Sequence, residues 1–261
     1  MQSTQHFDDP VAAYSRLAPH YAELSARREF YLRTIEEIIL SRVSKSAKSL
    51  LDVGAGDGAR ASRIAEQSGI QNVVLAEPSP EMVAPVAATK VWNVRAEEMG
   101  DQVRSKENGD LGTFDVITCL WNVLGHVRGF EKRGRAMRAM NNLLSPEGKC
   151  FIDVNHRYNA RAYGALPTLA RLVRDSISYA EENADVTATW EVCEEVISTY
   201  GHVFTDREIR QLAGAAGLEI EERIVVDYDS GKIRRFGFAG SLLYVLRRTS
   251  MRDSASPPHT S

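Results

Sequence analysis

Glycines and carboxylates gather in the segment LLDVGAGDG and the stretch after it. Gly54 and Gly56 allow a sharp turn and a close approach of the backbone to a ligand, because glycine has no side chain. Asp52 and Asp57 flank this turn, and Glu77 follows about twenty residues later. The spacing predicts a cofactor-binding loop between a strand and a helix.

The glycine spacing alone leaves two kinds of cofactor open. Gly54, Gly56 and Ala59 also fit the G-x-G-x-x-G/A pattern of nicotinamide dinucleotide enzymes. In those enzymes the loop receives a negatively charged pyrophosphate, which acids nearby would repel. S-adenosylmethionine instead carries a sulfonium and an ammonium group, which carboxylates attract. Asp52 and Asp57 therefore favour S-adenosylmethionine, with an NAD(P)-dependent oxidoreductase as the alternative.

Over roughly residues 48–155 the sequence resembles the class I S-adenosylmethionine-dependent methyltransferases, whose glycine motif is similar to LLDVGAGDG. The resemblance implies that Glu77 binds both ribose hydroxyls, which suits the two acceptor oxygens of a carboxylate. It implies further cofactor contacts at Ala55, Pro78, Met82 and Leu120.

The segment VRAEEM corresponds to the end of the third strand, where the family usually has an acid that contacts adenine. Arg95 stands at that position here. We expect the backbone amide of Ala96 to bind adenine, while Glu97 either takes the side-chain role or caps a helix. Upstream, Tyr21 resembles a lid tyrosine over the cofactor, and Arg28 is either a partner of the cofactor carboxylate or an ordinary surface arginine.

The segment FDVITCLWNVLGHV resembles the corresponding part of glycine N-methyltransferase-like enzymes, which carry an Asn and, four residues later, a His. Asn122 and His126 match that pattern, whereas Trp121 replaces a residue that is commonly small. A His titrates near neutral pH and can take a proton from the acceptor. We expect His126 to act as a base or to pack the following helix, and Asn122 to orient substrate or cap that helix.

Further substrate contacts are expected at the same edge of the sheet. Asn155 either contacts substrate or caps a helix, and His156, Arg157 and Tyr158 follow it directly. Arg157 would suit a carboxylate by bidentate pairing. Tyr14 is seven residues before Tyr21 and either covers the site or packs the helix. The complete set of expected substrate contacts is Tyr14, Trp121, Asn122, His126, Asn155, Arg157 and Tyr158.

Short apolar runs alternate with helical stretches from SLLDVG to KCFIDV, which predicts βαβ units and a doubly wound, mostly parallel α/β sheet of seven strands. Two helices are expected before the first strand. We predict a helical lid over 1–45, a Rossmann-like core over 46–156 and 204–249, a substrate cap over 157–203 and a disordered tail over 250–261, with Thr205 as a helix N-cap.

Composition narrows the class of partner. With 32 basic and 35 acidic residues, the chain has no overall field that would attract nucleic acid or a membrane. A small-molecule substrate, a cytoplasmic location and a monomer or homodimer are expected, without a metal. Cys119, Cys150 and Cys193 are expected to be reduced core residues. The alternative outside enzymes is a non-catalytic subunit that binds S-adenosylmethionine.

Overall fold

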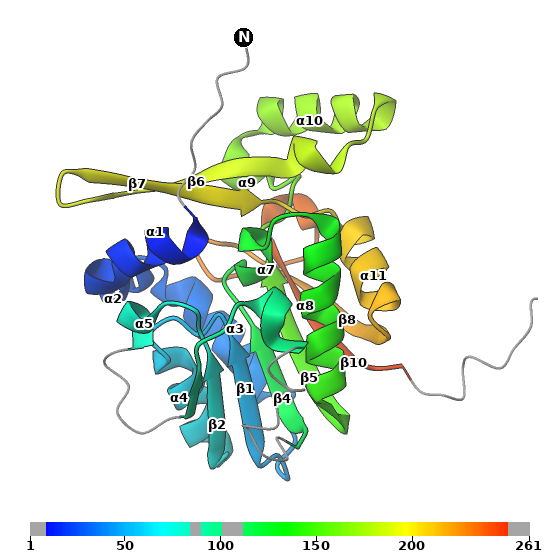
Figure 1. Ribbon diagram of the computed structural model, residues 1–261. Coiled ribbons are helices and arrows are strands. Elements are labelled where there is room, and N and C mark those ends of the chain that lie inside the picture. The colour runs from blue at the N-terminus through cyan, green and yellow to red at the C-terminus, as the bar shows by residue number, and fades with distance from the viewer. Residues whose placement is uncertain (1–8, 84–89, 101–111, 250–261) are drawn as a thin grey trace, which may run out of the picture.

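The computed structural model describes residues 9–83, 90–100 and 112–249. Its centre is an eight-stranded sheet in the order β3-β2-β1-β4-β5-β10-β8-β9 (Figure 1). The strands of this sheet are β1 (Ser49–Val53), β2 (Asn72–Ala76), β3 (Lys90–Trp92), β4 (Phe114–Cys119), β5 (Leu144–Val154), β8 (Leu218–Val226), β9 (Ile233–Arg234) and β10 (Ser241–Arg248). The predicted doubly wound α/β fold is confirmed.

The sheet is parallel from β3 to β5, and β10 then runs antiparallel between β5 and β8. The expected seven strands correspond to the sheet without β9, a two-residue strand that pairs with the end of β8. Strand β1 lies between β2 and β4, so the strand order reverses at β1. In parallel sheets, such a reversal opens a crevice at the carboxyl ends of the strands.

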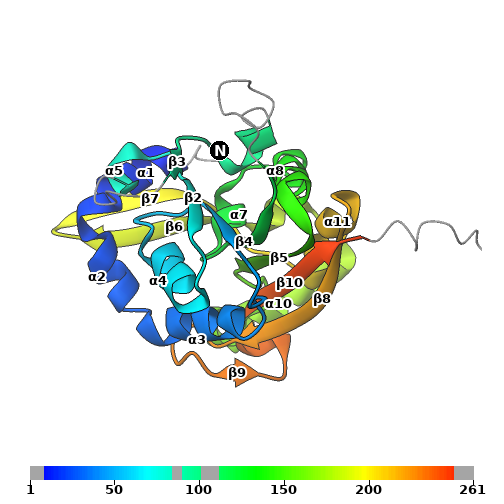
Figure 2. The same ribbon diagram turned by 90° about the horizontal axis from the view of Figure 1, so that it is seen from below.

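Helices cover both faces of the sheet (Figure 2). On one face, α8 (Phe130–Leu143) and α11 (Asp206–Ala215) pack against the alternate strand side chains. On the other face, α3 (Glu29–Leu40) and α4 (Ala59–Ser68) do the same. Thr205 caps α11 as predicted, since its hydroxyl accepts from the amide of Glu208 at 3.2 Å.

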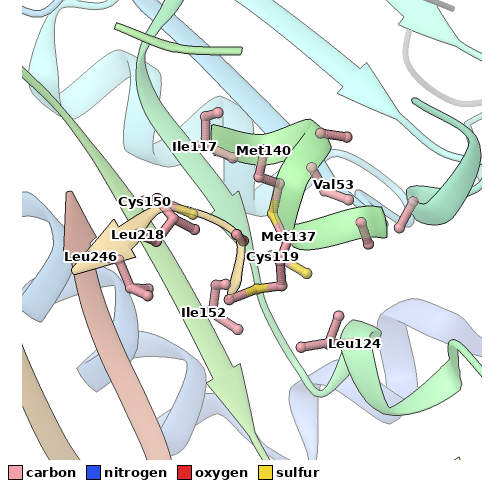
Figure 3. Packing of buried hydrophobic residues seen from close by; sticks show 14 of the residues in the cluster. Val53, Ile117, Cys119, Leu124, Met137, Met140, Cys150, Ile152, Leu218 and Leu246 are labelled. Carbon is pink, nitrogen blue, oxygen red and sulfur yellow. The ribbon is translucent and has the colours of Figure 1, made fainter. Parts of the chain in front are cut away.

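The larger core lies between β4, β5 and α8, where Met137 and Met140 fill the space against Ile117 and Ile152 (Figure 3). Cys119 and Cys150 belong to this core, and burial raises the pKa of the Cys150 thiol to about 12. Cys193 is exposed, so its predicted place in the core was wrong. It occupies a left-handed position in a hairpin turn whose residues are exposed.

The segment after β5 forms a cap above the carboxyl edge of the sheet (Figure 1). It consists of α9 (Ala160–Tyr163), α10 (Ala165–Ile177), a 3-10 turn (Glu181–Ala184) and an antiparallel hairpin of β6 (Asp185–Val192) and β7 (Glu195–His202). The hairpin is a separate two-stranded sheet.

Below the hairpin lie the N-terminal helices α1 (Pro10–Leu17) and α2 (Tyr21–Ala26), joined by a 3-10 turn (Ala18–His20) (Figure 1). Ala13 and Leu17 of α1 pack with Val192 and Ile197 of the hairpin. Two short helices and α3 thus replace the two predicted helices. The predicted tail over 250–261 lies outside the described residues, and no helix in the described part is long and apolar enough to cross a bilayer.

Candidate active site

Two adjoining cavities open at the carboxyl edge of the sheet, beneath α1 and the hairpin. We call the first, of about 730 Å³, the cofactor cleft. We call the second, of about 600 Å³, the acceptor chamber. Tyr14, Tyr21, Trp121 and His126 line both and form the boundary between them. Predicted site residues from the N-terminal helices and from the segment after β4 therefore meet at one place.

The floor of the cofactor cleft is the glycine loop between β1 and α4. Gly54 and Gly56 have φ of +65° and +59°, a conformation that favours glycine. A Cβ on Gly54 would lie 2.5 Å from Val123, and one on Gly56 would lie 2.9 Å from the Tyr21 hydroxyl. The loop is therefore closely covered by side chains that line the cleft, among them Tyr21 and Val123.

Glu77 follows β2 and lines the cleft. Its two oxygens accept from the backbone amides of Gly56 at 2.9 Å and Ser79 at 3.0 Å, which fixes the plane of the carboxylate. Burial raises the pKa of Glu77, while these two amides lower it. Each oxygen keeps a second lone pair, so the carboxylate can still accept from a pair of ribose hydroxyls.

Asp52 and Asp57 lie beside the loop rather than in the lining of the cleft. Asp52 is fully buried, and its Oδ1 accepts from the Thr118 hydroxyl at 2.6 Å. Its Oδ2 has no partner, and burial raises its pKa, which Arg60 counteracts. Asp57 accepts from the amide of Ala59 at 3.1 Å, at the start of α4.

Arg60 was not among the predicted site residues, although it lies beside the glycine loop. It is buried on the first turn of α4, it has no hydrogen-bond partner at Nε, and its charge interacts most strongly with Asp52. It lines a third, smaller cavity with Ala55, Asp57, Tyr21 and Trp121. Its position two residues after the last glycine of the motif was the available signal.

Arg28, by contrast, does not line the cleft. It forms an ion pair with Asp229, and its guanidinium lies over the ring of Tyr228, 4.5 Å from the centroid. The expected contact with the cofactor carboxylate is therefore not supported, because these partners, two hundred residues along the chain, hold the side chain elsewhere. Arg60 is the buried cation nearest to the loop acids.

The far end of the cleft is lined by Pro78, Ala96 and Glu97, as the resemblance implies, together with Arg95. Met82 is buried beneath, and its methyl group lies close to Gly56. Arg95 donates to Asp9 at 2.7 Å, and Asp9 also caps α1 through the amide of Val11. The residue that replaces the usual acid thus holds α1 over the cleft.

Trp121 and Asn122 both have left-handed backbones, with φ of 62° and 60°. Consecutive residues other than glycine in this region are strained, and such strain persists where the surroundings impose it. The buried Asp153 at the end of β5 accepts from the Asn122 amide at 3.1 Å and from the Tyr31 hydroxyl at 2.6 Å. This contact holds the turn that carries Trp121 to the boundary of the two cavities.

Asn122 lines the acceptor chamber, as expected, and its side-chain amide also holds the chamber wall together. Its Oδ1 accepts from the amide of Asn155 at 2.9 Å, and its Nδ2 donates to the carbonyl of His202 at 3.3 Å. No side-chain cap is formed on the following helix α7 (Val123–His126). The amide therefore joins β4, β5 and the hairpin at the wall of the acceptor chamber.

His126 lies at the boundary of the two cavities with both ring nitrogens engaged. Nδ1 lies 2.9 Å from the Tyr200 carbonyl oxygen, and Nε2 lies 3.0 Å from the Tyr14 hydroxyl. Because a carbonyl only accepts, Nδ1 carries the hydrogen and Nε2 accepts from Tyr14. Burial lowers the pKa of His126. The imidazole is thus held neutral, with its basic nitrogen toward Tyr14.

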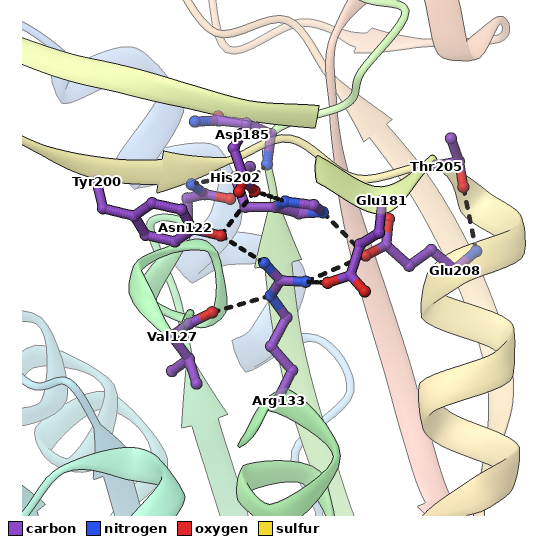
Figure 4. A network of polar contacts seen from close by, with 10 residues as sticks. Asn122, Val127, Arg133, Glu181, Asp185, Tyr200, His202, Thr205 and Glu208 are labelled. Atoms are coloured by element: carbon purple, nitrogen blue, oxygen red, sulfur yellow. Dashed lines mark hydrogen bonds and ion pairs between the residues drawn. The ribbon is translucent and has the colours of Figure 1, made fainter. Parts of the chain in front are cut away.

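A buried polar network holds the hairpin on the core (Figure 4). Arg133 of α8 donates to the Tyr200 hydroxyl, to Glu181 and to the carbonyl of Val127. His202 lies between Asp185 and Glu208, at 2.7 and 2.9 Å. Glu181, His202 and Glu208 are close enough to hold a metal ion, but Arg133 already supplies positive charge to these carboxylates. The network fixes Tyr200, whose carbonyl orients His126.

Arg157 and Tyr158 do not reach the acceptor chamber, contrary to expectation. Both bind Asp175 of α10, at 2.6 and 2.8 Å. His156 donates from Nδ1 to the carbonyl of Gly237 at 2.9 Å. Only Asn155 of this segment lines the chamber. Arg157 and Tyr158 thus hold the cap, because α10 brings the buried Asp175 carboxylate over them.

The fold and the site define a class I S-adenosylmethionine-dependent methyltransferase. A glycine loop, a carboxylate that lines the cleft after β2 and a cleft at the strand ends fit the adenosyl part of S-adenosylmethionine. Arg60, whose Nε has no partner, lines the small cavity beside the glycine loop and fits a carboxylate. A family model described as a methyltransferase domain matches residues 24–223, and the chain belongs to that family.

Solved structures share this fold. A S-adenosylmethionine-dependent methyltransferase from Clostridium acetobutylicum has a TM-score of 0.61 at 13% identity, over 91% of this chain and 99% of that one. The CcbJ methyltransferase from Streptomyces caelestis has a TM-score of 0.58 at 16% identity, over 83% and 90%.

A third structure shows the fold with a ligand pair. The 1,6-didemethyltoxoflavin-N1-methyltransferase from Burkholderia thailandensis, with its substrate and S-adenosylhomocysteine bound, has a TM-score of 0.58 at 16% identity, over 92% of this chain and 87% of that one. No curated protein sequence matches this chain. The protein is a methyltransferase, and S-adenosylmethionine is its cofactor.

Proposed function

We propose that the enzyme methylates a nitrogen or an oxygen of a small molecule bound in the acceptor chamber. The observation that carries this proposal is the neutral His126, with its basic nitrogen toward Tyr14, at the boundary between the chamber and the cofactor cleft. Nitrogen is slightly favoured by the resemblance of the Asn122 and His126 segment to glycine N-methyltransferase-like enzymes.

S-adenosylmethionine supplies, when bound, a methyl carbon activated for in-line displacement, with the bonding electron pair returning to sulfur. The protein then has to align the acceptor and remove its proton. Tyr14 and His126 provide a path for that proton, from the acceptor to the Tyr14 oxygen and from the Tyr14 hydroxyl to Nε2. The Tyr200 carbonyl stabilises the ring as it becomes positively charged, because it already accepts from Nδ1.

Exclusion of water depends on the lid and the cap. Tyr14 packs edge-on against His126 and Trp190, with centroids 5.2 and 5.6 Å apart, and Tyr21 packs against Trp121 at 5.5 Å. These rings belong to α1, α2, the hairpin and the turn after β4. The helical lid over 1–45 and the substrate cap over 157–203 are therefore proposed as closing elements. We further propose a cytoplasmic monomer or homodimer that binds neither nucleic acid nor membranes and needs no metal.

The test is transfer of a labelled methyl group from S-adenosylmethionine to acceptors, with His126→Asn beside the wild type. Asn can still donate to the Tyr200 carbonyl, but it has no basic nitrogen at the position of Nε2. We expect kcat to fall by about 10²- to 10³-fold, with S-adenosylhomocysteine binding unchanged. Tight binding of S-adenosylhomocysteine without transfer to any acceptor would favour a non-catalytic subunit instead.

A further inference from the structure

The acceptor chamber also indicates a substrate class, an inference that rests on the proposed function. We infer that the substrate is an uncharged, flat ring compound whose ring carries hydrogen-bond acceptors and a nitrogen or oxygen that bears a proton. Four properties of the chamber support this inference: its aromatic walls, the absence of charge in its lining, its unpartnered donors and the proton path at its boundary.

The walls of the chamber are mainly apolar, and aromatic rings occupy several sides. The apolar and aromatic residues of the lining are Tyr14, Leu17, Tyr21, Leu24, Trp121, Val186, Ala188, Trp190 and Tyr228. They come from α1, α2, the turn after β4, the hairpin and the loop after β8. Aromatic side chains pack best against flat rings, edge-on or offset. A planar substrate would bury its faces here, whereas a sugar would place hydroxyls against carbon.

No charged side chain lines the chamber within the described part of the chain. The titratable groups that face it are His126, which is held neutral, and the phenols Tyr14, Tyr21 and Tyr228. The guanidinium of Arg28 lies over the Tyr228 ring and is not part of the lining. A substrate ammonium or carboxylate would lose its hydration in the chamber without gaining a counter-charge, which is costly. Amino sugars and amino acids are therefore disfavoured.

Two groups of the chamber keep an unused donor. The Tyr228 hydroxyl accepts from Trp121 Nε1 at 2.7 Å, but its own hydrogen has no acceptor among the described residues. Burial raises the pKa of this phenol, which the Trp121 hydrogen bond and the Arg28 guanidinium only partly offset, so the hydroxyl keeps its hydrogen. The Nδ2 group of Asn155 likewise has no acceptor there, while its Oδ1 accepts from Ser241 at 3.4 Å. Two donors call for carbonyl oxygens or bare ring nitrogens on the substrate.

The boundary of the chamber indicates which kind of substrate atom accepts the methyl group. Its lone pair forms the bond to the methyl carbon, and its proton passes through the Tyr14 hydroxyl to Nε2 of His126. The product therefore leaves uncharged, and the proton stays on His126 until solvent takes it. A phenolic hydroxyl or a ring N–H has such a proton to lose, whereas a tertiary amine does not.

Three compounds test this inference by calorimetric titration of the enzyme saturated with S-adenosylhomocysteine. They are 7-hydroxycoumarin, the same ring with a carboxylate (7-hydroxycoumarin-3-carboxylic acid), and glucosamine as a cationic sugar. The pH is chosen so that the hydroxyl of 7-hydroxycoumarin is protonated. We expect 7-hydroxycoumarin to bind at least about tenfold more tightly than either charged compound. Equal or weaker binding, or no binding, contradicts the inference.

A charge placed in the chamber sharpens the test. Asn155→Asp keeps an oxygen for Ser241 but puts a carboxylate in the lining, so we expect weaker binding of 7-hydroxycoumarin and stronger binding of glucosamine. Asn72→Asp makes the same change at an exposed position at the opposite edge of the sheet and should alter neither. Unchanged ligand preference in Asn155→Asp contradicts the inference. The initial saturation with S-adenosylhomocysteine tests the proposed function separately, since failure of that step alone overturns it.

Discussion

The hydroxyl of Tyr14 lies 3.0 Å from Nε2 of His126 and joins the first helix to the turn after β4. The other ring nitrogen is held by the Tyr200 carbonyl, and the Tyr200 side chain is held in turn by Arg133 and Asp185. The lid, the cap and the core therefore meet at one imidazole. These contacts set the orientation of the ring and place its hydrogen on Nδ1.

This geometry predicts the protonation of His126. We expect NMR of ¹⁵N-histidine-labelled enzyme to show the neutral ring with hydrogen on Nδ1. Because burial lowers its pKa below the ordinary 6.5, the neutral base persists as the solution becomes more acidic. On the acid side of the pH profile, kcat/KM should thus begin to fall at a lower pH than an exposed histidine would give. A hydrogen on Nε2 at neutral pH would contradict the proton path.

The same lowered pKa affects stability. A histidine that is neutral in the folded state takes up a proton on unfolding once the pH falls below its unfolded pKa. The contribution of His126 is therefore fully present above that value and is lost on acidification. Stability of His126→Asn should fall less between neutral and mildly acidic pH than that of the wild type, as measured by urea unfolding. Parallel pH dependences would contradict this linkage.

The sequence predicted the parts of the site that local chemistry determines. The turn at Gly54 and Gly56 needs a positive φ, and Glu77 follows its strand directly, so each could be recognised within its own segment. Arg28 and Arg157 could not be placed in this way. The tertiary fold brings their partners, Asp229 and Asp175, next to them. These ion pairs decide whether each arginine side chain lies in a cavity or elsewhere.

The contrast between Arg28 and Arg60 leads to a prediction about the amino-acid end of the cofactor. Arg60→Gln should weaken S-adenosylhomocysteine binding by about 10- to 100-fold, the value of a charge-assisted hydrogen bond. Binding of 5′-methylthioadenosine, which lacks the carboxylate, should change little. Arg63→Gln, on the same helix but half-exposed and paired with Glu36, serves as the control. An equal loss for both ligands would assign Arg60 a purely structural role.

A comparison of alanine variants at Gly56 and Gly69 distinguishes the effect of backbone strain from the effect of a close side-chain contact. Both have positive φ, but a Cβ on Gly69 meets nothing within 4 Å, whereas one on Gly56 meets the Tyr21 hydroxyl. Alanine should cost about 1 kcal/mol of stability at either position. Only Gly56→Ala should also weaken S-adenosylhomocysteine binding, by about tenfold, because it displaces Tyr21. Urea unfolding and calorimetry measure the two effects, and intact binding in Gly56→Ala would refute the close cover by Tyr21.

The buried pair of Arg157 and Asp175 is expected to hold the cap. Asp175→Asn removes the counter-charge of an arginine with no exposed surface, which should cost about 3 kcal/mol. The loss should appear in urea unfolding and as faster proteolysis within the cap. Arg174→Gln, at a half-exposed neighbour of the pair, should change stability by less than about 1 kcal/mol. A similar loss in both variants would show that α10 is not held by this pair.

Equilibrium titration with S-adenosylhomocysteine and with NAD tests the identity of the cofactor most directly. We expect S-adenosylhomocysteine to bind at least about 100-fold more tightly, because the loop acids repel a pyrophosphate. Glu77→Gln should lose about 10- to 100-fold of that affinity, while Glu66→Gln, exposed on α4, should lose none. Equal or tighter binding of NAD, or full affinity in Glu77→Gln, would contradict the assignment of the cofactor cleft.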